Sequence, residues 1–366
     1  MLYFSLWIAL STGYLLSLST MMRGPMRRLL PPLLLLSLAT LGGIRWTTGT
    51  DWEPYWEFFT SGGSFRDYMS AWHFELGFKF VIWLLQDVGV GYSEWLFLLS
   101  FIVIAIKFAP IFRRPYILVC FLVLFGVAMA DIFPTRESIA ISLAMLSVHY
   151  LVERRYLVYL ICVVVACLFH STAIIFLVAP LVIAASYRTL LIATILGGIL
   201  AKFLIFSVIL FLTNYLGLSE LVQAANLYSD TISGRISLLS IGQKAVVMLF
   251  TLSMLPKFRE KMTSFEIASV KLLCFGLISS VILESVSQIF NRLTQYFVSF
   301  EVIAASALIW FYSKYLIQEK RYLTLLVLFC AVCTFYAMRF YGLLKNFADL
   351  YYPFETVFQS SHRSVY

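Results

Sequence analysis

The sequence predicts an all-α, polytopic integral membrane protein with about twelve transmembrane helices. Of its 366 residues, 61% are hydrophobic and only 13% are charged, too little charge to cover the surface of a soluble protein. Many apolar runs approach the roughly 20 residues that a helix needs to cross the hydrocarbon core. These runs lack the alternation of polar and apolar residues that a transmembrane barrel requires. Helices are therefore expected to satisfy the backbone inside the lipid.

The expected spans follow the apolar runs along the chain. They lie at 1–21, 29–44, 94–110, 115–131, 135–151, 156–170, 172–186, 189–213, 241–256, 264–284, 293–312 and 322–340. No basic segment precedes the first run, so we expect it to be a retained span and not a cleaved signal peptide. No internal repeat is visible, and residues 1–366 are predicted to form a single polytopic domain.

The segment 74–90 decides the orientation of the chain. It reads FELGFKFVIWLLQDVGV, and it either crosses the membrane or lies at its surface. If it does not cross, most basic residues collect in loops on one side, which the positive-inside rule assigns to the cytoplasm. The net charge of +8 is then explained by membrane orientation, and no nucleic-acid partner is expected. Both termini and a long first loop, 45–93, would face outward.

Several polar residues then fall at the outer ends of different helices: Arg45, Arg136, His170, Glu284 and Arg292. A charge at membrane depth costs at least about 2.5 kcal/mol, so such residues usually serve a function. The helices on either side of His170 are short, which is expected to place it below the outer surface, in a cavity lined by protein.

Simpler interpretations of these residues stay open. Arg45 beside Trp46 has the composition of an interfacial anchor. Arg136 has Glu137 and Asp131 as possible ion-pair partners, and Arg292 has Glu284. His170 is compatible with a purely structural histidine at a helix end.

The residue types at this face suit a phosphorylated sugar. Arginine binds the oxygens of a phosphate or diphosphate in bidentate fashion. The first loop adds candidate carboxylates (Asp51, Glu53 and Glu57) and flat aromatic surfaces against which sugars stack, unless these aromatics form an interfacial belt. They are Trp46, Trp52, Tyr55, Trp56, Phe58 and Phe59. The six cysteines lie in apolar runs, so neither a disulfide nor a metal site is expected.

The stretch RWTTGTDWEPYWEFF resembles the first-loop signature of the EpsG family of Wzy-type polysaccharide polymerases, an arginine followed by Gly-x-Asp and a spaced tyrosine. Other motifs of that family follow in the expected order. They are the turn containing Arg136, the stretch 169–173 (FHSTA), Asn291-Arg292-Leu293 with Tyr296, and Tyr352-Pro353-Phe354 before Phe358. Two residues depart from the pattern: Trp52 replaces a more usual tyrosine, and Glu137 replaces an expected glutamine.

The resemblance implies a membrane glycosyltransferase of GT-C-like architecture in the bacterial cytoplasmic (inner) membrane, with its active site facing the periplasm or exterior. Its substrates would be polyprenyl-diphosphate-linked oligosaccharides for an exopolysaccharide or an O-antigen. A chain-length regulator and a flippase would be partners, and no cofactor is expected. The alternatives are an O-antigen ligase-like transferase, a transporter or flippase of lipid-linked sugars, and a membrane acyltransferase with His170 as base.

Candidate roles follow from this chemistry. His170 is the expected general base because histidine titrates near neutral pH, and Asp51 is the alternative. Arg45, Arg136 and Arg292 would stabilise the diphosphate leaving group. The further substrate-binding candidates are Tyr55, Glu137, Asn291 and Tyr296.

Overall fold

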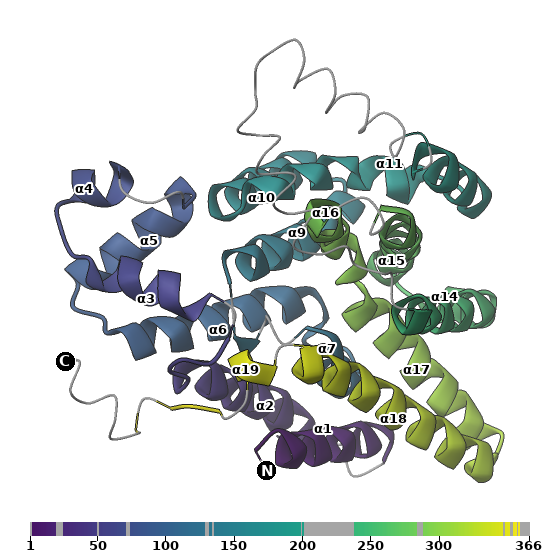
Figure 1. Cartoon of the computed structure of the whole chain (residues 1–366). Coiled ribbons are helices and arrows are strands. Elements are labelled where there is room, and N and C mark those ends of the chain that lie inside the picture. The colour runs from purple at the N-terminus through teal and green to yellow at the C-terminus, as the bar shows by residue number, and fades with distance from the viewer. Residues whose placement is uncertain are drawn as a thin grey trace. The chain divides into compact units, whose positions relative to one another are not determined.

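The computed structural model is helical throughout the residues that it describes (Figure 1). These residues are 2–19, 25–49, 51–70, 74–128, 132–133, 135–198, 200, 238–283, 288–346, 348–351, 354–356 and 358. The only β-type pairing among them is an isolated antiparallel bridge between Arg45 and Thr356. The prediction of an all-α fold is confirmed. Contacts divide the chain into two compact units, Met1–Ile174 with Ile309–Tyr366 and Ile175–Leu308.

The first unit begins with apolar helices and carries the long first loop. Its elements are α1 (Leu2–Leu18), α2 (Pro25–Gly43), α3 (Trp52–Thr60), α4 (Phe65–Ser70), α5 (Leu76–Asp87), α6 (Tyr92–Phe108), η1 (Ala109–Ile111), α7 (Ile117–Val127), α9 (Arg136–Val152), α10 (Tyr156–Phe169), α18 (Tyr322–Asn346) and α19 (Ala348–Tyr351). Helix α17 (Glu301–Gln318) and the 3-10 helix η2 (Ser171–Val178) each straddle a boundary between the units.

Helix α7 forms the centre of the first unit. It is apolar on every face, and all residues from 117 to 126 are buried against helices such as α1 and α18. A helix that is hydrophobic all round requires such a position, because it has no polar face for water. Gly126 permits the closest approach, since a Cβ there would lie only 2.8 Å from the Cβ of Tyr336 on α18.

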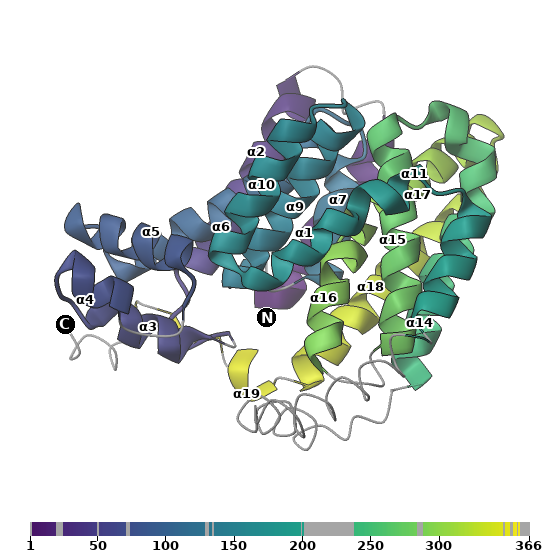
Figure 2. The ribbon, with the colours of Figure 1, turned by 90° about the horizontal axis from the view of Figure 1, so that it is seen from above.

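The first loop folds into a small helical layer next to α6. In both ribbon views α3, α4 and α5 gather beside that helix (Figures 1 and 2). Their inward side chains form an aromatic core with α6, in which Tyr55, Phe58, Phe78 and Trp95 are almost fully buried. The twelve residues of α5 extend about 18 Å, less than the roughly 30 Å of the hydrocarbon core, and the prediction that the segment 74–90 does not cross the membrane stays a prediction.

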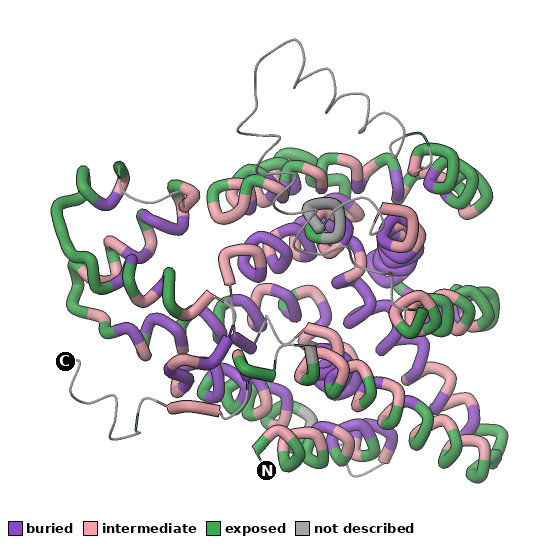
Figure 3. The backbone as a smooth tube through the Cα atoms, in the orientation of Figure 1, coloured by how far each residue is buried: buried purple, intermediate pink, exposed green. Residues whose placement is uncertain are grey.

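The second unit consists of η2, α11 (Ala179–Ala184), a helical stretch over 187–198, α14 (Leu238–Phe258), η3 (Arg259–Lys261), α15 (Ser264–Leu283), α16 (Gln288–Val298) and the start of α17. Helices α15 and α16 pack closely at Gly276, where a Cβ would lie 2.7 Å from that of Phe297. Helix α14 buries few of its residues (Figure 3), as expected of an apolar helix that faces lipid.

Each predicted span contains helical structure among its described residues. Parts of the spans 1–21, 115–131, 189–213 and 264–284 lie outside the described residues. Five helical segments are long and apolar enough to cross a membrane: Tyr92–Ile111, Leu238–Lys261, Ser264–Leu283, Arg292–Gln318 and Tyr322–Lys345. The other apolar helices among the described residues have 10–17 residues. The number of twelve crossings, the GT-C-like architecture and the single domain therefore stay predictions.

Candidate active site

Arg136 occupies the first position of α9, where a cation is electrostatically unfavourable. Thr135 caps this helix: its hydroxyl accepts a hydrogen bond from the backbone N–H of Ser138, while the Ser138 hydroxyl accepts one from the backbone N–H of Thr135. The positive end of the helix dipole points at the guanidinium, so Arg136 does not serve the stability of α9 itself. Its side chain lies over the ring of Phe74, with Cζ 4.4 Å from the ring centre.

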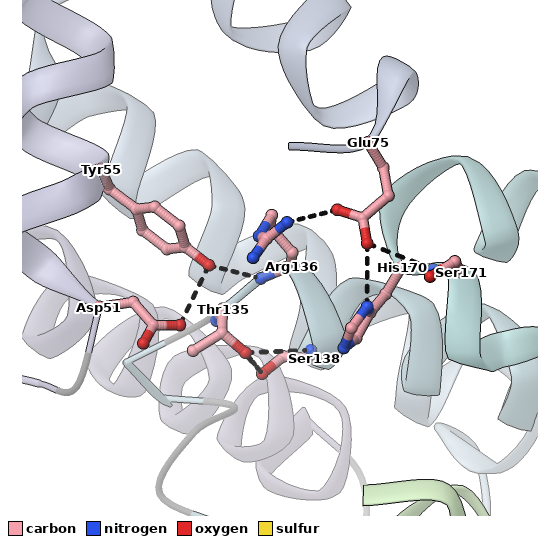
Figure 4. Close-up of polar contacts among 8 residues, drawn as sticks. All are labelled: Asp51, Tyr55, Glu75, Thr135, Arg136, Ser138, His170 and Ser171. Atoms are coloured by element: carbon pink, nitrogen blue, oxygen red, sulfur yellow. Dashed lines mark hydrogen bonds and ion pairs between the residues drawn. The ribbon is translucent and has the colours of Figure 1, made fainter. Parts of the chain in front are cut away.

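The partner of Arg136 is Glu75, which precedes the first residue of α5. One oxygen of its carboxylate, Oε2, forms an ion pair with Nη1 of Arg136. The other oxygen, Oε1, lies 3.0 Å from Nδ1 of His170 and accepts a hydrogen bond from the backbone N–H of Ser171 at 3.3 Å. One carboxylate therefore joins three segments that lie far apart in the sequence (Figure 4).

His170 reaches this carboxylate because of the way in which α10 ends. The residue adopts an extended conformation just after α10, and the chain continues from it into η2. Helix α5 approaches this end closely at Gly77, where a Cβ would lie 2.8 Å from both Cβ and the carbonyl oxygen of Leu168. Only glycine fits there without a shift of α5 or α10, and this contact positions Glu75 beside His170.

The cluster of Glu75, Arg136 and His170 is only partly buried. The side chains of Glu75, Arg136 and His170 retain 18%, 23% and 14% of their exposure, so a ligand can reach them. Burial alone would raise the pKa of the Glu75 carboxyl. The hydrogen bond with His170 and the charge of Arg136 outweigh this effect and lower that pKa to about 2. Glu75 is thus an anion at neutral pH.

Tyr55 and Asp51 extend the polar network from the other side of Arg136. The Tyr55 hydroxyl accepts a hydrogen bond from the backbone N–H of Arg136 at 3.0 Å and donates one to Oδ2 of Asp51 at 3.3 Å. Burial raises the pKa of Tyr55 far above its ordinary value, so the phenol remains protonated. The structure thus brings four of the predicted site residues, Asp51, Tyr55, Arg136 and His170, into one network.

Arg45 lies in the interior of the first unit, and 2% of the residue is exposed. Its Nη1 donates a hydrogen bond to the carbonyl of Thr48 at 3.3 Å, and its guanidinium lies 5.6 Å from the ring centre of Phe133. Gly49, with φ of +113°, passes so near that a Cβ there would lie 2.6 Å from Nη1. These contacts show Arg45 supporting the turn that carries Asp51, and its predicted contact with a diphosphate stays a prediction.

The remaining predicted site residues lie on helix α9 and in the second unit. Glu137 is half-buried next to Arg136, whose ion pair among the described residues is with Glu75. Asn291, Arg292 and Tyr296 belong to α16 in the second unit, where Arg292 is exposed and Tyr296 fully buried. Their roles stay predictions. The predictions that concern Asp131, Glu284, Tyr352 and Pro353 lie outside the described residues.

The aromatic residues of the first loop are placed differently from a sugar-stacking surface. Trp46, Tyr55, Phe58 and Phe59 are buried in the aromatic core, with ring contacts such as the edge-on packing of Tyr55 against Trp95 at 5.9 Å. Burial of such large apolar surfaces stabilises the loop, which explains why they point inward. Of the six aromatic residues predicted to stack on sugars, only Trp52 and Trp56 remain half-buried and so accessible for that role.

Glu75 is the site residue that sequence reasoning did not identify. It stands directly before an apolar helix, at the N-cap position, although glutamate is not among the residues preferred there. In the structure its side chain makes no capping hydrogen bond to α5. A carboxylate next to an apolar run in the first loop was the available signal. Among the described residues, no group of three or more histidine, cysteine, aspartate or glutamate side chains is arranged to hold a metal ion.

Comparison with known proteins identifies one family. The model described as "EpsG family" matches residues 28–356, nearly the whole chain. No curated protein and no solved structure matches. The matched range contains the second unit, most of the first unit and every residue of the network around Arg136.

Proposed function

Because the chain belongs to the EpsG family, a family of polysaccharide polymerases, we propose that it joins oligosaccharide repeat units carried on a polyprenyl diphosphate. The reaction would take place on the outer side of the bacterial cytoplasmic membrane. The observation that supports this proposal most directly is the cluster of Arg136 and His170 on the Glu75 carboxylate, which unites an anion-binding group and a base.

The proposed step transfers the growing chain. A hydroxyl at the non-reducing end of the incoming lipid-linked unit attacks the anomeric carbon of the growing chain, forming a new glycosidic C–O bond. The bond from that carbon to the carrier breaks, and the polyprenyl diphosphate leaves with the electron pair. The proton of the attacking hydroxyl passes to His170, as in general base catalysis.

Arg136 is suited to the charge that develops on the leaving group. It combines a permanently charged guanidinium with the positive end of the α9 dipole, and both favour an anion at this point. A preorganised cation at the site of developing charge stabilises the transition state without further reorganisation. Arg292, exposed on α16 of the second unit, stays a predicted diphosphate-binding residue.

The test is to incubate the purified protein with lipid-linked repeat units and separate the products by size. A polymerase produces a ladder whose steps equal one repeat unit. A ligase-like transferase produces only a product on a different acceptor, and a transporter leaves the covalent structure of the substrate unchanged. If the folded protein and intact lipid-linked repeat units yield no ladder, the proposal is contradicted.

A further inference from the structure

The Glu75 carboxylate serves two neighbours with its two oxygens. An ionised carboxylate only accepts hydrogen bonds, so the 3.0 Å contact requires the proton on Nδ1 of His170. In the neutral imidazole the lone pair is then on Nε2, the nitrogen that points away from Glu75 in Figure 4. The same carboxylate neutralises the charge of Arg136 while no anion is bound.

We propose that Glu75 is a positioning residue with two roles. It orients His170 so that Nε2 is the basic nitrogen, and it pairs with Arg136 until an anionic ligand binds that guanidinium in its place. The inference rests on the proposed function and adds a coupling to it. A diphosphate that binds Arg136 competes with Oε2 of Glu75, whereas the contacts of Oε1 with His170 and Ser171 remain. After the anion has bound, the Glu75 carboxylate therefore no longer pairs with Arg136 and continues to orient His170.

This arrangement predicts opposite effects on binding and turnover. Removal of the negative charge frees Arg136 for the anion, so affinity for a diphosphate rises. It also removes the charge that stabilises the protonated histidine during the reaction, so kcat falls. A residue with a merely structural role would weaken binding and turnover together.

The experiment uses the full-length protein with Glu75→Gln, which keeps the size of the side chain. Binding is measured with inorganic diphosphate, and kinetics with lipid-linked repeat units. We expect roughly tenfold tighter binding of diphosphate, the scale of one partly buried ion pair. We expect kcat to fall at least about tenfold, while KM stays equal or decreases. Asp87→Asn is the matched control, because it makes the same change at the exposed end of the same helix.

A second variant covers the case in which Glu75→Gln does not fold. Glu75→Asp keeps the charge but is one methylene shorter, so it cannot contact Arg136 and His170 at once. It is expected to lower kcat with little change in KM. The inference would be overturned if either Glu75 variant folds and keeps the kcat of the wild type. It would also be overturned if Glu75→Gln binds diphosphate more weakly and has a lower kcat.

The two proposals are separable. If the wild-type protein forms no polymer, the proposed function fails, and diphosphate binding to Glu75→Gln still decides whether Glu75 shields Arg136. If the wild type forms polymer and the variants match it, only the role of Glu75 fails.

Discussion

The close contact at Gly77 offers a way to disturb the site without changing any of its polar groups. In Gly77→Ala the new Cβ would lie 2.8 Å from Cβ and the carbonyl oxygen of Leu168, whereas ordinary contact begins at 3.4 Å. Helix α5 must therefore move away from α10 by about 0.6 Å. If the movement is along the Glu75–His170 direction, that hydrogen bond lengthens from 3.0 Å to about 3.6 Å, beyond useful geometry.

The expected result is a loss of turnover that exceeds the loss of stability. A displacement near 1 Å of a reacting group costs on the order of 10²-fold in rate, so we expect a decrease of at least roughly tenfold. Overpacking costs about 1–3 kcal/mol, partly offset by the higher helix propensity of alanine.

The assay compares initial rates of polymer formation and thermal unfolding of Gly77→Ala with those of Gly342→Ala. The latter introduces the same methyl group on α18, where nothing lies within 4 Å, and it should behave as the wild type. Full activity of a folded Gly77→Ala protein would refute the argument that this contact positions Glu75.

Four further predictions concern the network and the topology. Arg136→Lys should lose most activity at normal protein levels, because lysine keeps the charge but lacks the planar fork; normal polymer formation would make Arg136 structural. His170→Gln should lower the rate on the order of 10²–10⁴-fold, and normal turnover combined with an inactive Asp51→Asn would transfer the role of base to Asp51. The lowered pKa of Glu75, about 2 in the folded protein, means that its ionised carboxylate stabilises the fold by roughly 1–2 kcal/mol after allowance for solvent screening. This stabilisation should be complete above the ordinary pKa of a glutamate and vanish as the pH falls through 2. Thermal unfolding of the wild type and Glu75→Gln across this pH window measures it, and a difference in stability that does not change with pH would contradict the assignment. A cysteine at Ser93 should react with an impermeant thiol reagent from outside, and protection there would reverse the proposed orientation.

The sequence was sufficient for the features that depend on local composition. Uninterrupted apolar runs predicted the helices. The distribution of basic residues predicted that the segment 74–90 does not cross the membrane, which stays a prediction. The polar ends of the helices pointed to Arg136 and His170. That these two residues share one network could be anticipated only through the assigned topology.

The contacts that complete the site depend on tertiary packing and leave little trace in the sequence. Glu75 reaches Arg136 and His170 because Gly77 permits a close approach of two helices that are distant in the chain. Burial of the aromatic residues results from a core that forms only when α3, α5 and α6 assemble. Arg45 is buried separately, next to Phe133 and the backbone of Thr48. Periodicity within a short helix such as α3 does not reveal whether its apolar face meets protein, lipid or a sugar.

The pairing of the first loop with the C-terminal segment has a consequence for biosynthesis. Trp46 donates its backbone N–H to the carbonyl of Glu355 at 3.0 Å, and Gly49 donates to that of Leu350 at 2.8 Å. The turn that carries Asp51 thus acquires these partners only after the ribosome has synthesised the last apolar helix. A nascent chain that stops before Leu350 lacks both of the carbonyl groups that pair with the first loop. Such a chain therefore leaves two backbone donors of the first loop, the N–H groups of Trp46 and Gly49, without these partners.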